Sequence, residues 1–83
     1  MKLRILTPTG LVLETDCSEV LIPAAGGALG IRGGHTELVV PLIAGQLLAK
    51  TANNEEVRYM LTAGSAEITA KILTVLVESA LLN

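Results

Sequence analysis

Short apolar runs, each ended by glycine, proline or a small polar group, recur along the whole chain. At the start, Leu3 and Ile5 alternate with Lys2 and Arg4, and a Pro-Thr-Gly group follows at 8–10. A period of two between apolar side chains is typical of a β-strand with one buried face, and proline and glycine are typical turn residues. The runs are also far shorter than the roughly 20 residues of a membrane-spanning helix. The chain is therefore expected to fold as a series of short strands.

The remaining runs place further strands between turn signals. The expected strands are 2–7, 11–14, 18–22, 28–31, 37–41, 45–50, 57–62, 66–69 and 72–77. The polar group Thr15-Asp16 separates two of them, and residues 51–56 are expected to form a hairpin turn. The stretch 72–82 also fits an amphipathic helix, but its β-branched residues favour a strand. Together these strands predict an all-β fold, a small β-sandwich or flattened barrel of about 8–10 mostly antiparallel strands.

The small size of the chain limits how much apolar surface it can hide. With 83 residues there is room for one domain, which buries roughly 60% of its unfolded surface. Hydrophobic residues make up 51% of the chain, yet it has one tyrosine and no tryptophan or phenylalanine, so the core is aliphatic. Some apolar surface is expected to stay exposed, and exposed apolar patches mark contacts with a protein or a membrane.

Charge and cysteine content exclude several classes of protein. The net charge is −2, and the six Lys and Arg residues are scattered along the sequence, which argues against nucleic-acid binding. One tyrosine is too few for base stacking. Cys17 is the only cysteine, so an intrachain disulfide is impossible, and a small buried hydrophobe is its expected role.

No enzymatic motif is recognisable in the sequence. The glycines of 26–34 lack the lysine of a phosphate-binding loop and the spacing of a dinucleotide fingerprint. Cys17, Ser18 and Glu37 do not stand in the sequence context of a catalytic triad with His35. His35 is the only histidine, and one histidine cannot make a zinc site without carboxylate ligands. No catalytic residue, metal site or cofactor is expected.

Residues 26–38 are the most distinctive segment, because they hold five glycines and the only histidine between two apolar runs. Glycine at this density marks positive φ angles or close approach to another surface. For His35 two roles stay open: it caps a turn, or it faces a partner across an interface. The glycine pairs at 26–27 and 33–34 are compatible with tight turns and with a contact.

Residues 27–38 read Gly-Ala-Leu-Gly-Ile-Arg-Gly-Gly-His-Thr-Glu-Leu, with a further glycine at position 45. This segment resembles the pattern Gly-x-Leu-Gly-Ile-x-x-Gly-His-x-x-Leu in the N-terminal domain of the epsilon subunit of bacterial and chloroplast F-type ATP synthases, and of the matching mitochondrial delta subunit. The turn at 7–10, the strand at 20–23, the hairpin at 53–54, Ala63-Gly64 and residues 74–76 follow in register. The resemblance covers essentially the whole chain.

The resemblance implies a non-catalytic rotor subunit of the central stalk, which clamps the gamma shaft to the c-ring and couples proton or sodium transport to ATP synthesis or hydrolysis. It implies a peripheral position on the cytoplasmic face of the bacterial inner membrane, without a cofactor. It assigns three residues to the gamma contact: Arg32, His35 and Leu38. It assigns Ala28 and Leu29 to the c-ring contact and a loop-shaping role to Gly27, Gly30 and Gly34.

The chain departs from the family pattern at three places. Ala28 stands where an acidic residue is common, which removes any charge pairing with the ring, and Gly64-Ser65 replaces a pair of glycines. Family members commonly continue into a two-helix C-terminal domain, whereas this chain ends at Asn83. Residues 1–83 are therefore expected to form the sandwich domain alone, either as a naturally short form or as a truncated one.

Two other readings of the same strand pattern remain. The first alternative is a free-standing small β-domain that binds a ligand or an extended peptide along an open edge, and the second is a small hydrolase that uses His35. The first of these predicts no affinity for a helical shaft.

Overall fold

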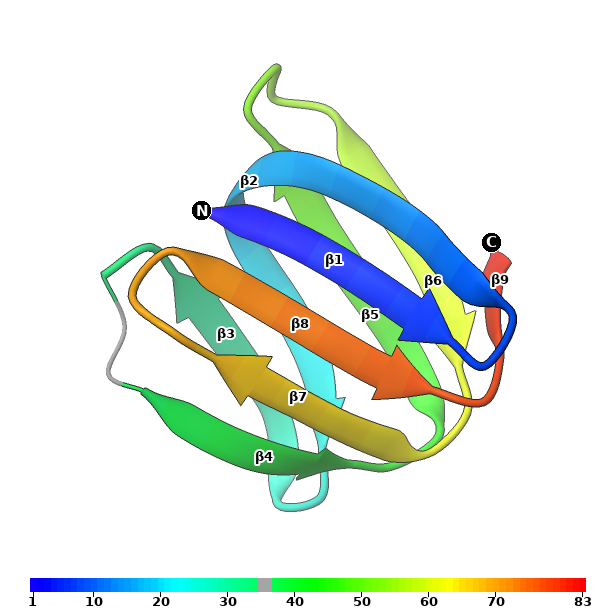
Figure 1. Ribbon diagram of the computed structural model, residues 1–83. Helices are drawn as coiled ribbons and strands as arrows, with labels where there is room; N and C mark the ends of the chain where they lie inside the picture. Colours follow the sequence, from blue (N-terminus) through cyan, green and yellow to red (C-terminus); the bar gives the residue numbers. More distant parts are fainter. Residues whose placement is uncertain (35–36) are drawn as a thin grey trace.

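The computed structural model describes residues 1–34 and 37–83 and contains nine strands within those ranges (Figure 1). The strands are β1 (Lys2–Thr7), β2 (Gly10–Ala24), β3 (Gly27–Arg32), β4 (Leu38–Leu42), β5 (Gly45–Thr51), β6 (Glu56–Leu61), β7 (Gly64–Ile68), β8 (Ile72–Val77) and β9 (Ala80–Leu82). In the same part of the chain, no helix is long and apolar enough to cross a membrane.

The strands form two layers that share β2 (Figure 1). The first half of β2 pairs with β1, and β8, β7 and β4 continue that layer. The second half of β2 pairs with β3 on one side and β5 on the other, followed by β6 and β9. A single pair, Ala24 with Leu42, joins β2 to β4 at one corner. The predicted small sandwich or flattened barrel is confirmed.

Most strand pairs are antiparallel, as predicted, and β1 with β8 is parallel. That pair brings the first and the last third of the chain side by side in the middle of one layer (Figure 1). Four pairs join consecutive strands, namely β1–β2, β2–β3, β5–β6 and β7–β8. The other pairs join strands farther apart in the chain, so the fold combines hairpins with several long-range contacts.

Between the layers lies an aliphatic core, as the composition predicts. Its largest fully buried side chains are Leu3, Ile5, Val20, Ile22, Ile31, Leu47, Ile68, Leu73 and Val75. They come from six different strands, and those that share a strand stand at alternate positions, because successive side chains of a strand point to opposite faces. Tyr59, the only aromatic residue, is also buried at the edge of this core.

Two predictions about strand bounds are wrong. The runs 11–14 and 18–22 belong to one strand, β2, and Thr15-Asp16 does not interrupt it. The two polar residues lie where β2 passes from one layer to the other, and a register shift between Cys17 and Glu19 marks the bend. Pairing continues through this point because each half of the strand has its own partner strand.

The second wrong bound concerns the C-terminal stretch, where the strand β9 was not expected. The turn between β8 and β9 is formed by Glu78 and Ser79, which carry neither glycine nor proline. Smaller differences of one or two residues occur at the ends of β3, β4, β5, β6 and β7.

Candidate partner interface

The glycine-rich segment becomes strand β3 with a turn at each end, and the residues assigned to two partners lie toward opposite ends of that strand. Ala28 and Leu29 lie next to the β2–β3 turn, whereas Arg32 ends the strand. At about 3.3 Å per residue, Ala28 and Arg32 are about 13 Å apart along β3. Two separate contacts are therefore geometrically possible.

Two of the three glycines expected to shape the segment have positive φ angles. Gly27 has φ +126° at the β2–β3 turn, and Gly34 has φ +79° after β3. Glycine adopts this region without strain because it has no Cβ. Gly30 instead lies inside β3 opposite Leu21, and an ideal Cβ there would be 4.0 Å from Leu21 Cδ1. Because Gly30 has no side chain, the side chain of Leu21 has no neighbour at this position of β3.

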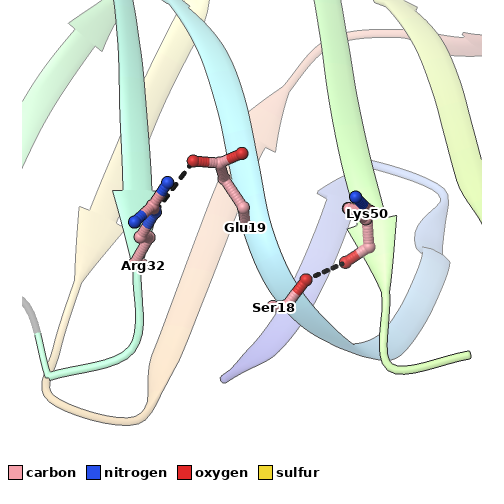
Figure 2. A network of polar contacts seen from close by, with 4 residues as sticks. All are labelled: Ser18, Glu19, Arg32 and Lys50. Carbon is pink, nitrogen blue, oxygen red and sulfur yellow. Dashed lines mark hydrogen bonds and ion pairs between the residues drawn. The ribbon is translucent and has the colours of Figure 1, made fainter. Parts of the chain in front are cut away.

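Arg32 is held on the outer face of the second layer by an ion pair across two strands (Figure 2). Its Nε donates a hydrogen bond to Glu19 Oε2 at 2.9 Å, and the two residues are direct register partners. The side chain of Arg32 is nevertheless 78% exposed, against 44% for Glu19. On the far side of Glu19 lies Lys50, whose carbonyl oxygen accepts a hydrogen bond from Ser18 Oγ at 3.4 Å.

The other residues assigned to the gamma contact follow β3. His35 lies outside the described residues. Leu38 begins β4, pairs with Ile68 of β7 and is 45% exposed. The backbone N–H of Gly34 donates to the carbonyl oxygen of Ala70 at 3.1 Å, which ties the end of the glycine segment to the β7–β8 turn. Arg32 and Leu38 therefore flank one end of the sandwich.

At the opposite end of β3, Ala28 is exposed, but Leu29 packs partly against the core. A backbone bond from Ala25 to the carbonyl oxygen of Pro41, of 3.1 Å, joins the β2–β3 turn to β4. The surface presented there is the turn with the small side chain of Ala28, without a charged group of its own.

Exposed apolar side chains also occur at places that the sequence did not single out. Val39 is exposed next to Leu38 at the start of β4, Ile43 is exposed directly after the end of β4, and Leu81 and Leu82 are exposed on β9. A signal was present for β4, because Leu38 and Val39 are consecutive apolar residues that cannot both point into the core. As the composition predicts, a sizeable apolar surface remains in contact with solvent.

The described residues contain little that suggests catalysis or metal binding. No group of three or more His, Cys, Asp or Glu residues there is placed to hold a metal ion. Cys17 is buried, and burial raises the pKa of its thiol; the Met1 amine opposes this rise and Asp16 adds to it. A protonated, inaccessible thiol is a poor nucleophile. The arrangement leaves exposed surfaces, and it defines a small β-sandwich domain.

Comparison with known proteins identifies which domain this is. The family model described as "ATP synthase, Delta/Epsilon chain, beta-sandwich domain" matches residues 1–83. The chain therefore belongs to the delta/epsilon chain β-sandwich family of ATP synthases, as the resemblance implied.

Several relatives share this domain. The chloroplastic ATP synthase epsilon chain of Cyanidioschyzon merolae is 39% identical over 80 residues, which cover 96% of this chain and 60% of the relative. That of Trieres chinensis is 39% identical over 77 residues, with 93% and 57% covered. The ATP synthase epsilon chain of Rickettsia typhi is 28% identical over 83 residues, with 98% and 76% covered. The chain spans about three fifths of the length of the first two.

Solved structures share the fold. A chain of the Euglena gracilis mitochondrial ATP synthase superposes with a TM-score of 0.89 at 18% identity, covering 96% of this chain and 51% of that chain. A chain of the Tetrahymena thermophila mitochondrial ATP synthase central stalk and c-ring gives a TM-score of 0.80 at 19% identity, with 96% and 64% covered. At such identities the likeness is one of fold, and it supports the β-sandwich.

Proposed function

We propose that the chain is the β-sandwich domain of a non-catalytic central-stalk subunit in an F-type ATP synthase. The observation that carries this proposal is the family match along all of residues 1–83. In this role the domain binds the gamma shaft and the c-ring, and it helps to couple ion transport to ATP synthesis or hydrolysis. Residues 1–83 form the sandwich domain of that subunit.

The gamma contact is made at the end of the sandwich where β3 ends and β4 begins. Arg32, His35 and Leu38 are its residues. The exposed guanidinium of Arg32 and the exposed side chain of Leu38 support this assignment, because a polar group beside an apolar anchor is typical of a protein interface. His35 enters by the family resemblance alone.

The c-ring contact is made at the other end of β3, through Ala28, Leu29 and the β2–β3 turn. Ala28 is exposed there, but Leu29 has much of its side chain turned toward the core. Since no charged side chain is contributed by these two residues, the ring contact rests on shape and backbone groups. It is the weaker of the two contacts.

The subunit performs no reaction of its own and lies at the cytoplasmic face of a bacterial inner membrane through its partners. Two observations support the absence of catalysis. The thiol of Cys17 is buried, and the hydroxyl of Ser18, the other nucleophile considered, donates a hydrogen bond to a backbone carbonyl oxygen. The membrane association is peripheral.

Calorimetry with the purified gamma subunit tests this function. We expect one-to-one binding, and we expect Leu38→Asp to weaken it by about 2 kcal/mol, because the variant places a charge in a desolvated contact. Leu11→Asp is the matched control, since Leu11 is 52% exposed and lies beside the β1–β2 turn. Absence of binding by a chain that circular dichroism shows to be folded would favour the free-standing β-domain.

A further inference from the structure

Four of the six lysine and arginine side chains gather at one end of the sandwich, although they are far apart in the sequence. They are Lys2, Arg32, Lys50 and Lys71, here called the basic end. Two hydrogen bonds join the segments that carry them: the backbone N–H of Lys2 donates to the carbonyl oxygen of Lys71 at 2.9 Å, and that of Gly34 donates to Ala70 at 3.1 Å. The start of β1, the end of β3 and the β7–β8 turn therefore meet (Figure 1).

The two halves of the basic end adjoin each other. Lys2, Asp16, Gly33 and Lys71 line one groove, and Glu19, Arg32 and Lys50 line another. Gly33 of the first groove directly follows Arg32 of the second in the chain, so the two grooves meet at the end of β3.

The charge of this end is opposite to that of the rest of the chain. Among the described residues, the acidic side chains that line the two grooves with the four cations are Asp16 and Glu19, which leaves the two grooves a net positive charge. The chain as a whole carries −2. Glu56 lies opposite Lys50 in the register, but its carboxylate contacts Arg58 at 3.4 Å. Such a separation of charge steers association with a surface of the opposite sign.

Within the basic end, Glu19 orients Arg32. The bond from Nε to Glu19 takes up the inner edge of the guanidinium, while the side chain as a whole is 78% exposed. A guanidinium held in this way presents its outer edge to solvent, where it matches the two oxygens of a carboxylate. Figure 2 shows the two side chains reaching toward each other from neighbouring strands.

We propose that the basic end is the electrostatic docking surface for the gamma subunit, that the surface of gamma which meets it carries acidic side chains, and that Glu19 is a positioning residue for Arg32. This inference rests on the proposed function, since Arg32 belongs to both. It adds Lys2, Lys50 and Lys71 to the contact and states the chemistry of the partner's surface.

Association rates with purified gamma, measured by stopped flow at about 20 mM and about 300 mM salt, test the docking surface. The variant Lys2→Gln/Lys71→Gln is compared with Arg4→Gln/Gln46→Glu, which changes the net charge equally but lies outside the basic end. We expect the first variant to slow association at low salt roughly tenfold and to flatten its salt dependence, and the control to do neither. Equal effects of the two variants, or a salt-independent rate for the unchanged chain, would overturn the proposal.

A double-mutant cycle tests the role of Glu19. Glu19→Gln is expected to speed association slightly, because it removes a negative charge, and to speed dissociation several-fold, because Arg32 loses its orientation. In an Arg32→Gln background the effect on dissociation should vanish. A dissociation rate that Glu19→Gln leaves unchanged, or changes equally in both backgrounds, would contradict the positioning role.

These experiments separate the docking role of the basic end from the central-stalk function. Tight binding with an association rate that depends neither on salt nor on the charge variants contradicts the docking role and leaves the central-stalk function unaffected. No binding of gamma at all by the folded chain overturns both.

Discussion

At the scale of single residues, close packing between neighbouring strands decides what is tolerated. Gly64 begins β7 directly against β8, and a Cβ at this position would overlap the carbonyl oxygen of Leu76 and come within 2.9 Å of Val77 Cγ1. Backbone atoms cannot move aside as a flexible side chain can. The family pattern of two glycines at this point is reduced here to Gly64-Ser65, and the one that remains is the one that the packing requires.

Gly64→Ala is therefore expected to lower the free energy of unfolding by about 3 kcal/mol. Gly26→Ala is the matched control, because nothing lies within 4 Å of its Cβ and its φ angle is not positive. This control should stay within about 0.5 kcal/mol of the unchanged protein. Urea unfolding of the three proteins measures the difference, and equal midpoints would show that β7 and β8 can separate at little cost.

Cys17 predicts a dependence of stability on pH. Its thiol has a raised pKa in the folded state because of burial, so the folded chain holds the proton to a higher pH than the unfolded chain. The stability from the neutral buried thiol is complete below the unfolded pKa, about 8.5, and is lost as pH rises through the folded pKa.

Urea unfolding of the unchanged chain and of Cys17→Ala between about pH 7 and about pH 10 tests this linkage. At neutral pH the variant should be less stable, because it leaves a small cavity in the core. The gap should narrow with rising pH, because only the unchanged chain has the thiol to ionise. A gap that stays constant would mean that the thiol has its ordinary pKa in the fold.

At the scale of elements, the strands differ in how firmly they are held. β9 pairs with β6 over three residues only, and two of its three side chains are exposed. Its turn is anchored by Thr62, whose hydroxyl accepts a bond from the N–H of Ser79 at 3.0 Å and donates to the carbonyl oxygen of Ser79 at 3.3 Å. One side chain outside the strand thus adds to the hold on β9, beside the backbone bond of 3.1 Å from the N–H of Thr62 to the carbonyl oxygen of Ser79.

Thr62→Val removes both of these hydroxyl bonds while keeping the shape of the side chain. The amides of β9 should then exchange with solvent about tenfold faster, since each lost bond to an exposed group contributes roughly 1 kcal/mol. Amides of β8 serve as the internal reference. Thr9→Val is the control variant, because its hydroxyl bonds only to Thr7 in the β1–β2 turn. Unchanged exchange in β9 would show that strand pairing alone holds it.

The sequence predicted strands well where apolar and polar residues alternate, as in β1 and β8, because alternation reports burial directly. It failed at Thr15-Asp16, because a strand that changes partners carries exposed polar residues at the crossing without ending there. It missed β9, whose turn lacks the usual residues. Gly30 was expected to shape the segment, yet it has no positive φ angle and lies inside β3, since a glycine-rich sequence does not say which glycines need a positive φ angle.

At the scale of the whole molecule, the features that the sequence did not predict arise from contacts between strands that are far apart in the chain. Lys2 and Lys71 look scattered in the sequence, but the parallel pairing of β1 with β8 places them at one end. No local pattern signals this pairing. The candidate contact at Arg32 and Leu38 followed from the family resemblance, while the ion pair with Glu19 required the register of β2 with β3.

The core of an 83-residue chain is modest, so the free energy that a bound partner adds is large compared with the stability of the chain alone. With gamma at about one hundred times its dissociation constant, the free energy of unfolding should rise by about 2.7 kcal/mol. For a domain of this size that shifts the unfolding temperature upward by roughly 10–20 °C. Thermal unfolding followed with and without gamma measures the shift, and serum albumin at the same concentration controls for crowding. An unchanged midpoint would argue against the gamma contact.

One feature of the chain path bears on how the domain carries load. Because β2 belongs to both layers, a continuous covalent strand runs from the β1–β2 turn in one sheet to the β2–β3 turn in the other. Sliding of one sheet over the other would have to stretch or break that strand's own ladders rather than only slip side chains past each other. The sandwich therefore resists shear between its two sheets through a shared covalent strand as well as through side-chain packing.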